Sequence, residues 1–258
     1  MSSNRVVLSP GIGEKGIVPA KYFRTVFEPS TKKVLYSQPF DYLCVYDFEC
    51  NCVKDRAEPL EFNEIVEFPV VIIDVKNKKI AGEFHTYIRP TLEKEVKPFC
   101  TELTGITNER CFAEGVPTLE EALAKLHNFL LDFGMFQKEF VFMSCGDFDG
   151  NQMAREAQRK NISVPNYLKR WINLKKVFPK DATNKSFRAD SDAWTTIGQE
   201  AKAKPSGGMT AMLNALQIPL EGRHHSGIDD ARNLAKIVIA MLDRDFEFNQ
   251  AMVNNKKY

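Results

Sequence analysis

The sequence predicts a mixed α/β (α+β) domain in which helices flank a sheet. Three apolar runs, residues 42–50, 64–75 and 81–90, have the length and composition of strands. Only a polar turn at 76–79 separates the second run from the third, and consecutive strands this close favour an antiparallel meander. Strand and helix patterns then follow one another as far as about residue 245, an order typical of α+β and mixed α/β domains. We expect the first strand to be central.

Each predicted element has a local signal. The first strand is apolar on both faces, as buried strands are, and it ends in carboxylates. Pro69 cannot donate a hydrogen bond to a neighbouring strand, so a bulge or a sheet edge is expected there. Thr118 and Glu121 match a capping box that opens a helix with apolar residues at helical spacing.

The C-terminal half continues the alternation. Residues 140–145 form a fourth strand, a helix follows to about Lys160, and residues 170–178 form a fifth strand or a strand–helix junction. Helices at about 209–216 and 227–245 end the pattern. The predicted organisation is an N-terminal arm at 1–38, a domain at 39–246 with an insertion at about 180–206, and a C-terminal tail at 247–258.

Length and composition exclude some classes of function. The 258 residues, 43% of them hydrophobic, are enough to bury a core, and a net charge of +1 excludes a protein that coats a polyanion through basicity alone. An enzyme that grips a short nucleic-acid end needs only a few phosphate contacts. The six cysteines form no obvious framework, the start lacks the apolar core of a secretory signal, and no apolar run approaches membrane-spanning length. We expect an intracellular protein, in cytoplasm, nucleus or both, without a membrane partner.

Carboxylates gather at the ends of the predicted elements. Asp47 and Glu49 are two residues apart at the end of the first strand, so their side chains point to the same face of the sheet. Asp147 and Asp149 follow the fourth strand, and either of the two can be a functional group. Any single acid here can be a solvated loop residue or a helix cap. Two acids that end a buried strand are different, because they repel each other and lose hydration unless a cation neutralises them. Oxygen ligands from several elements suit Mg²⁺ or Mn²⁺, and two such ions clamp both oxygens of a phosphodiester cleavage.

The segment before the last helix contains two histidines and two aspartates. With Ser226 as the cap, Ser226-x-x-Asp229 is an Asp variant of the capping box. An advance of about 100° per residue places Asp229 on the solvent face and Asp230 at the edge of the buried stripe. Asp230 is therefore the better ligand. His225, five residues earlier, is placed to take a proton from the attacking water, and His224 is a spare that contacts a phosphate.

Together these segments resemble a known family. "DFE" after the first strand, "FD" after the fourth and "HSGIDD" near the end resemble the three motifs of the DEDDh 3′–5′ exonucleases. "EIVEFPVVIIDV", "YIRP", "FCTELTGIT" and "WINLKKVF" are similar to the enhanced-RNAi subgroup, which includes the histone-mRNA 3′-end exonuclease. The resemblance covers about residues 42–178 and 208–242. It implies an RNase H-like fold, a five-stranded mixed sheet flanked by helices.

The resemblance also implies an activity and a set of site residues. The activity is the removal of nucleotides from single-stranded RNA 3′ ends, and also from DNA, with release of 5′-monophosphates in RNA processing or turnover. It selects Asp149 over Asp147, which becomes a cap or loop acid. The implied ligands of two Mg²⁺ or Mn²⁺ ions, with Asp47 bridging, and the implied general base are Asp47, Glu49, Asp149, Asp230 and His225.

The stretch "FCTELTGIT" is implied to cradle the terminal nucleotide. Phe99 and Leu103 would pack on the base, and the backbone near Thr104 and Gly105 would meet the sugar. Stacking on an aromatic ring tolerates any base, which suits an enzyme that moves along a strand. An ordinary core role for Phe99 and Leu103 is the alternative. Phe148 stands before Asp149 as a further substrate contact, where relatives often carry tryptophan.

Two other functions remain open at this stage. One is a DNA-degrading or proofreading exonuclease, which differs only in substrate, because nothing in the sequence reads the 2′-hydroxyl. The other is a nucleic-acid-binding module without turnover, against which the complete set of acids argues. The insertion is longer than the resemblance leads us to expect. No separate helical nucleic-acid module precedes the domain, so recognition of a structured stem-loop is not expected.

Overall fold

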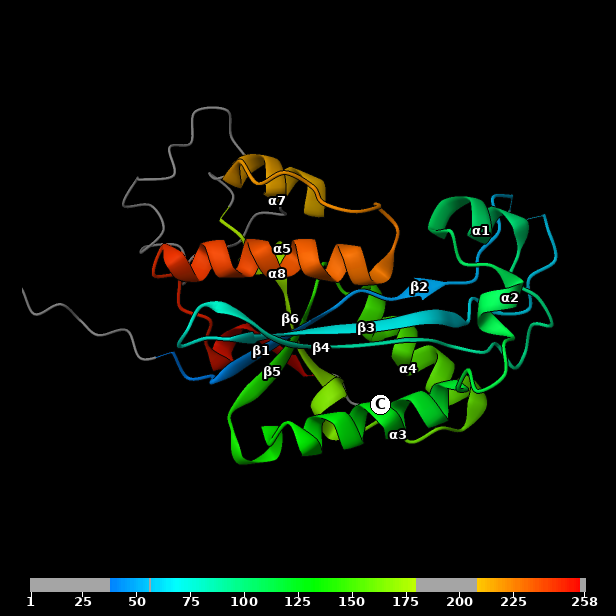
Figure 1. Ribbon diagram of the computed structural model, residues 1–258, viewed down its shortest axis with the longest axis horizontal. Coiled ribbons are helices and arrows are strands. Elements are labelled where there is room, and N and C mark those ends of the chain that lie inside the picture. Colours follow the sequence, from blue (N-terminus) through cyan, green and yellow to red (C-terminus); the bar gives the residue numbers. More distant parts are fainter. Residues whose placement is uncertain (1–37, 56, 180–207, 256–258) are drawn as a thin grey trace, which may run out of the picture. The chain divides into compact units, whose positions relative to one another are not determined.

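The computed structural model describes residues 38–55, 57–179 and 208–255, with a mixed sheet between two layers of helices (Figure 1). The predicted insertion and nearly all of the predicted N-terminal arm lie outside the described residues. The strands run in the order β4-β3-β1-β5-β6-β7, and short β2 also pairs with β3. The strands are β1 (Tyr42–Tyr46), β2 (Glu49–Cys50), β3 (Ile65–Asp74), β4 (Lys79–Tyr87), β5 (Phe140–Ser144), β6 (Arg170–Asn173) and β7 (Val253–Asn255).

The predicted meander and the central first strand are confirmed. Strand β3 is antiparallel to both β1 and β4, whereas β5 is parallel to β1 and to β6. The mixed sheet is therefore an antiparallel half joined to a parallel half through β1. Both faces of β1 are buried, which explains its continuous apolar sequence: Leu43 and Val45 pack on one face, Cys44 and Tyr46 on the other.

The described residues contain two short strands beyond the five expected. Strand β2 arises because the first apolar run is interrupted between Tyr46 and Glu49. Strand β7 lies where the sequence predicted a C-terminal tail, and it pairs antiparallel with β6. Phe248 is completely buried just before it. The domain therefore continues past residue 246, and the tail boundary was placed too early because three short-strand residues carry little periodic signal.

Pro69 lies neither at a sheet edge nor at a bulge. It pairs with His85 of β4, and on its other side it lies opposite the break between β1 and β2. The register shifts of β3 occur elsewhere, between Ile72 and Ile73 against β4 and opposite Glu49 and Cys50 of β2. Pro69 has no N–H to donate, and the sheet accommodates it at the break between β1 and β2, where no strand residue in the described part of the chain pairs with it on that side.

Helices cover both faces of the sheet (Figure 1). Helices α7 and α8 pack on one face, and α3 and α4 pack on the other. The predicted capping box of Thr118 and Glu121 is confirmed at the start of α3, and residues 170–178 form the strand–helix junction. The helices are α1 (Pro98–Thr104), α2 (Asn108–Cys111), α3 (Leu119–Asp132), α4 (Phe148–Lys160), α5 (Leu174–Val177), α7 (Met209–Leu216) and α8 (Gly227–Asp243), with 3-10 turns at η2 (Met135–Gln137), η3 (Asn166–Lys169) and η6 (Gln250–Met252).

Helices α1 and α2 lie beside the start of β3. Cys100 of α1, Cys111 of α2 and Ile106 between the two helices pack with Val66 of β3 in a third core cluster. Across the described ranges, no helix has both the length and the apolar character needed to cross a bilayer.

Candidate active site

Two of the predicted acidic sites meet because β1 and β5 are parallel neighbours. Their carboxyl ends lie at one edge of the sheet, so Asp47 after β1 is close to the turn that leads from β5 into α4. Gly146, at a φ of 127°, makes this turn. Asp149, the second residue of α4, reaches back and its Oδ1 accepts a hydrogen bond of 2.9 Å from the backbone N–H of Phe48. Asp149 therefore contacts the segment between Asp47 and Glu49.

The third acidic site comes from α8, which packs over the sheet. Asp230, the fourth residue of α8, is buried. One carboxylate oxygen each from Asp47, Glu49 and Asp230 lie within 4.8 Å of one another, close enough to hold a metal ion. The structure thus brings together Asp47, Glu49, Asp149 and Asp230 from three separate parts of the chain.

The pKa values of these carboxyl groups reflect their crowding. Burial, followed by the charges of Asp149, Glu49 and Asp230, raises the pKa of Asp47 well above its usual range. Burial and the charge of Glu67 raise the pKa of Glu49 to about 8, and burial raises the pKa of Asp149 to about 6. Burial also raises the pKa of Asp230. Four acids that resist ionisation in contact with one another form a site that a cation stabilises.

Asp147 stands apart from this cluster. Its carboxylate forms an ion pair of 2.8 Å with Lys176 and accepts hydrogen bonds from Trp171 Nε1 at 3.3 Å and Asn254 Nδ2 at 3.1 Å. Burial alone would raise its pKa, but these contacts outweigh burial and lower it. Asp147 lies at the N-cap position of α4 without a capping hydrogen bond, and it links the turn after β5 to β6 and β7.

Both histidines lie beside Asp230. The Nδ1 atom of His224 is 3.0 Å from Asp230 Oδ2, and the backbone N–H of His225 donates to the same oxygen at 2.9 Å. The two rings are stacked, with centroids 4.0 Å apart. His225 has a φ of 66°, in the left-handed region that non-glycine residues adopt infrequently. Burial and the neighbouring His224 lower the pKa of His225, so its ring is neutral at neutral pH.

The predicted capping box of α8 does not form. Ser226 occupies the N-cap position, but its side chain makes no capping hydrogen bond. Asp229 instead accepts a hydrogen bond of 3.0 Å from the backbone N–H of Arg223 and pairs with Arg232. Asp229 stabilises the turn before α8, so its side chain is engaged away from the acid cluster, as the helical-face argument required.

Helix α1 presents the predicted substrate residues. Phe99 and Leu103, four residues apart on one face, are half-buried and belong to none of the core clusters of the described residues. The hydroxyl of Thr104 donates to the carbonyl of Cys100 and accepts from the backbone N–H of Ile106, so it is engaged at the end of the helix. Gly105 ends the helix at a φ of 77°.

Two cations that the sequence did not assign to the site lie near it. Arg223 donates from Nη2 to the carbonyls of Glu102 and Leu103, at 2.8 and 3.2 Å, and so joins the turn before α8 to α1. The charge of Lys175 lowers the pKa of both Asp47 and Asp149. No local pattern indicates the contacts of Arg223, since they join segments that are about 120 positions apart along the chain. Phe148 is 55% exposed at the start of α4, beside Asp149.

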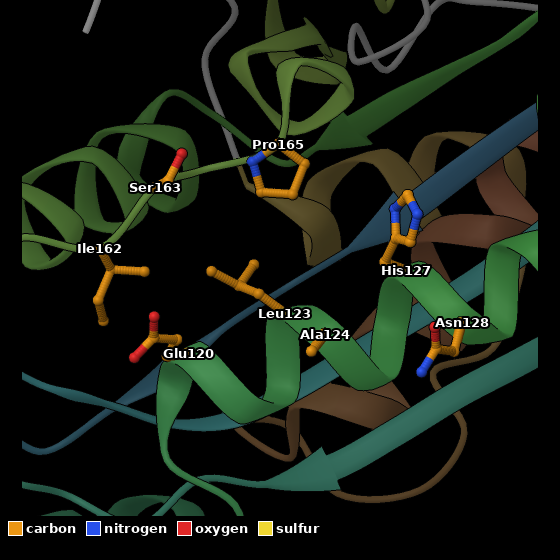
Figure 2. Close-up of a pocket in the computed structure, with 8 residues that line it drawn as sticks. All are labelled: Glu120, Leu123, Ala124, His127, Asn128, Ile162, Ser163 and Pro165. Atoms are coloured by element: carbon orange, nitrogen blue, oxygen red, sulfur yellow. The ribbon is translucent and has the colours of Figure 1, made fainter.

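A pocket of about 270 Å³ lies elsewhere, between α3 and the segment that follows α4 (Figure 2). Its lining is largely apolar and includes Leu123, Ala124, Ile162 and Pro165. None of the clustered acids lines it, so it is separate from the candidate active site.

Comparisons with known proteins agree with this geometry. Residues 44–238 match the RNase_T family, described as exonuclease. Human ERI1 exoribonuclease 3 is 33% identical over 216 residues, which cover 83% of this chain and 57% of that protein. The 3′–5′ exonuclease Snipper of Drosophila melanogaster is 31% identical over 247 residues, which cover 90% of this chain and 78% of that protein.

Solved structures show the same fold. The nuclease domain of 3′hExo, a DEDDh family member solved bound to rAMP, superposes with a TM-score of 0.68 at 27% identity, covering 84% of this chain and 98% of that domain. The chain spans just over half the length of ERI1 exoribonuclease 3 and of 3′–5′ exoribonuclease 1. The match over most of the domain, together with the acids that the fold assembles, establishes that this chain belongs to the DEDDh family of RNase T-like 3′–5′ exonucleases.

Proposed function

We propose that this protein is a metal-dependent 3′–5′ exonuclease that removes nucleotides from single-stranded RNA 3′ ends and releases 5′-monophosphates, in RNA processing or turnover. One observation carries the proposal: four carboxyl groups from β1–β2, α4 and α8 converge, burial raises the pKa of all four, and repulsion from neighbouring acids raises it further for Asp47 and Glu49. Such a cluster is stable as a set of carboxylates only when a cation is bound.

The donor set fits two hard divalent cations, Mg²⁺ or Mn²⁺. The four predicted ligands offer only carboxylate oxygens, and a second group that could hold an ion joins Asp230 to the ring nitrogens of His224 and His225. Burial raises the pKa of the nearby Cys145 thiol to about 12, so it stays protonated. Asp47, Glu49, Asp149 and Asp230 would hold the ions. When bound, the ions supply a nucleophilic water and stabilise the charge on the leaving oxygen.

The protein itself handles the proton. His225, neutral at neutral pH, would accept a proton from the attacking water. Asp230 fixes the backbone of His225 through the 2.9 Å hydrogen bond, so one aspartate serves both the metal site and the base. His224, stacked on His225 and paired with Asp230, would orient this arrangement and contact a phosphate.

The substrate end would lie along α1. Phe99 and Leu103 offer a half-buried apolar face that packs on the terminal base, and the backbone at Thr104 and Gly105 meets the sugar. The exposed ring of Phe148 supplies a second stacking surface beside Asp149. Stacking contributes about 1–3 kcal/mol per base and tolerates any base, as a processing exonuclease requires.

The names of the relatives support RNA as the substrate. Human ERI1 exoribonuclease 3 and human 3′–5′ exoribonuclease 1 are named for RNA, and the 3′hExo domain was solved with a ribonucleotide. Snipper is named as a 3′–5′ exonuclease without a stated sugar, and DNA ends remain the second candidate substrate.

A panel of 5′-labelled single-stranded, duplex and overhang oligonucleotides, in RNA and in DNA, tests the proposal. With Mg²⁺ or Mn²⁺ we expect a ladder of products shortened from the 3′ end, fastest on single-stranded RNA, and no cleavage with EDTA. Chromatography of the released nucleotides should show 5′-monophosphates. Equal or faster cleavage of DNA would replace RNA processing with the DNA alternative.

Asp47→Ala serves as the inactive control. We expect it to abolish hydrolysis without loss of the fold, as judged by circular dichroism. If the unsubstituted protein binds the oligonucleotides but cleaves none of them with either ion, the protein is a binding module on a nuclease scaffold. That result would overturn the proposal.

A further inference from the structure

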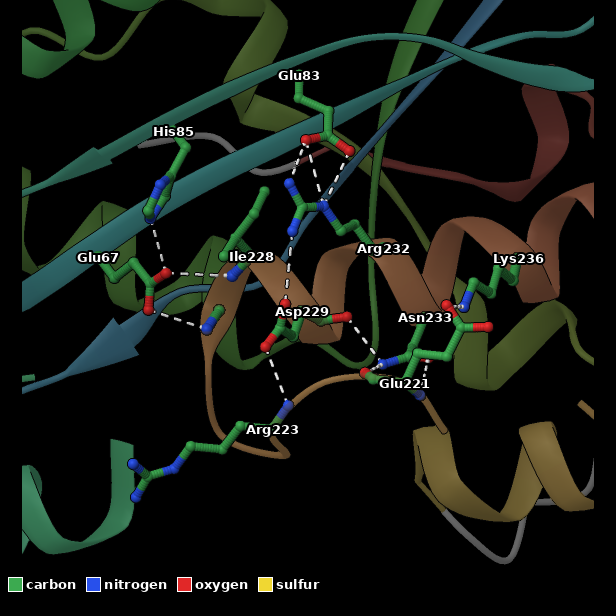
Figure 3. Close-up of polar contacts among 11 residues, drawn as sticks. Glu67, Glu83, His85, Glu221, Arg223, Ile228, Asp229, Arg232, Asn233 and Lys236 are labelled. Atoms are coloured by element: carbon green, nitrogen blue, oxygen red, sulfur yellow. Dashed lines mark hydrogen bonds and ion pairs between the residues drawn. The ribbon is translucent and has the colours of Figure 1, made fainter. Parts of the chain in front are cut away.

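A buried carboxylate outside the predicted ligand set, Glu67, lies within an apolar stretch of β3. Its side chain is almost completely inaccessible, with the residue 1% exposed. An ionisable group in such a place loses hydration, so its contacts have to replace the lost water. Figure 3 shows where they are: the side chain points from the strand to the first turn of α8.

Glu67 caps α8 from the sheet. Its Oε2 accepts a hydrogen bond of 2.9 Å from the backbone N–H of Gly227, and its Oε1 accepts one of 3.2 Å from that of Ile228 (Figure 3). The first amides of a helix have no partner within the helix, and the side chain of Ser226 does not serve them. The negative charge of Glu67 also suits the positive end of the helix dipole.

The same carboxylate is fixed on its other side. His85, on the neighbouring strand β4, places Nε2 2.8 Å from Glu67 Oε1. Both oxygens of Glu67 are therefore occupied, and the side chain has one orientation available. The cap of α8 is thus joined to two neighbouring strands, β3 through Glu67 and β4 through His85.

The position of this cap relates it to the candidate active site. Glu67 is the register partner of Glu49 in the β2–β3 pair. Gly227, which Glu67 holds, is three residues before Asp230, and a Cβ atom at Gly227 would lie 2.7 Å from the backbone oxygen of Asp47. The first turn of α8 is thus seated directly against the chain that carries the other acids.

We infer that Glu67 is a positioning residue: it anchors the start of α8 on the sheet, so that Asp230 and His225 reach the Asp47–Glu49 pair. This inference rests on the proposed function, because it takes Asp230 as a metal ligand. Groups that orient ligands from outside the metal site commonly change metal affinity or activity by about 10–100-fold when they are replaced.

Glu67→Gln in the full chain tests the inference. The amide keeps the shape of the side chain but turns one acceptor into a donor that faces a backbone N–H. In the metal-free protein, we expect faster hydrogen exchange of the amides at residues 225–231. We also expect calorimetry to give Mn²⁺ binding weakened by about 10–100-fold, and kcat to fall by a similar factor with an unchanged KM for the oligonucleotide. His85→Gln should shift the same quantities in the same direction, by less.

Glu83→Gln is the matched control. Glu83 also joins the sheet to α8, through an ion pair of 2.6 Å with Arg232, but it contacts the helix beyond its first turn. Its substitution removes a sheet-to-helix contact and should leave exchange at 225–231, Mn²⁺ affinity and kcat unchanged. If Glu67→Gln behaves as Glu83→Gln does, the positioning role is wrong.

Asp230→Asn separates this inference from the proposed function. Loss of Mn²⁺ binding in Asp230→Asn together with unchanged binding in Glu67→Gln would overturn the inference alone. Unchanged Mn²⁺ binding in Asp230→Asn would overturn the proposed ligand set, and the inference with it.

Discussion

At the scale of single residues, the two adjacent histidines have different roles because they contact Asp230 in different ways. His224 uses its ring to contact Asp230, whereas His225 makes this contact through its backbone N–H. A ring whose pKa is lowered is the better proton acceptor. The ring of His224, which contacts the buried Asp230, is better suited to hold that carboxylate in position.

Replacing each histidine by alanine should therefore have different effects. We expect His225→Ala to lower kcat by about 10²-fold or more, because general-base catalysis typically contributes 10²–10⁴-fold. Its Mn²⁺ affinity should change little. His224→Ala should lower kcat less and weaken Mn²⁺ binding, since Asp230 loses a partner. Single-turnover rates and calorimetry on both variants check this, and the opposite order of rates would exchange the two roles.

Residue-level prediction from the sequence worked where a local rule applied. The helical period placed Asp230 at the edge of the buried stripe, and the structure buries it there. The same rule could not foresee that Ser226 leaves its capping role to Glu67, because that contact spans 160 positions along the chain. The signal that existed was a glutamate inside the otherwise apolar run "IVEFPVV", since a buried acid requires a partner.

At the scale of elements, the start of α8 packs against the break between β1 and β2. This packing determines how close Asp230 comes to Asp47 and Glu49. The helix can come this close only because its first residue is Gly227, beside the backbone of Asp47. A side chain there would push the helix away from the sheet, and Asp230 with it. The close approach of α8 to the backbone of Asp47 therefore requires glycine at position 227.

Gly227→Ala should be destabilising and nearly inactive. Its Cβ atom would lie 2.7 Å from the Asp47 carbonyl and 3.1 Å from Glu67 Oε2, and overpacking of this kind typically costs about 1–3 kcal/mol. Gly208→Ala, at the start of α7, is the comparison, because a Cβ atom there meets nothing within 4 Å. Urea denaturation should show a lower free energy of unfolding for Gly227→Ala alone; equal stability of the two variants would contradict the close approach.

Most helices and strands could be predicted because each has its own periodic pattern of apolar residues or a capping residue at its start. The meander, the capping box of α3 and the boundaries of α7 and α8 follow from such signals. Helix α1 was interpreted only as a substrate-binding stretch, since seven residues offer too little period to reveal a helix. Strand β7 was missed because its pairing with β6, more than 80 residues earlier, supplies its stability.

At the scale of the whole molecule, the acid cluster links stability to pH and to metal. In the folded protein, the pKa of Glu49 is raised from 4.5 to about 8 and that of Asp149 from 3.8 to about 6. The folded state therefore binds more protons than the unfolded state between these values. Stability from these groups is fully present below pH ~4 and is lost as the pH rises through their folded pKa values.

The metal-free protein should consequently become less stable from about pH 5 to about pH 8. Bound Mg²⁺ or Mn²⁺ should reverse this trend, since the ions favour the ionised carboxylates, and their binding should release protons. Urea denaturation across this pH range, with EDTA and with Mn²⁺, checks both trends. Stability that rises with pH in EDTA would show that the carboxyl groups are not crowded as the structure has them.

Strand β7 has a practical consequence for shortened versions of this chain. It covers the outer side of β6, and Asn254 within it hydrogen-bonds to Asp147, two positions from Asp149. A version trimmed after residue 246 would leave β6 as a bare edge strand, a surface prone to intermolecular pairing. It would also remove one contact of Asp147, leaving those from Lys176 and Trp171. Truncations and C-terminal fusions should therefore begin beyond residue 255.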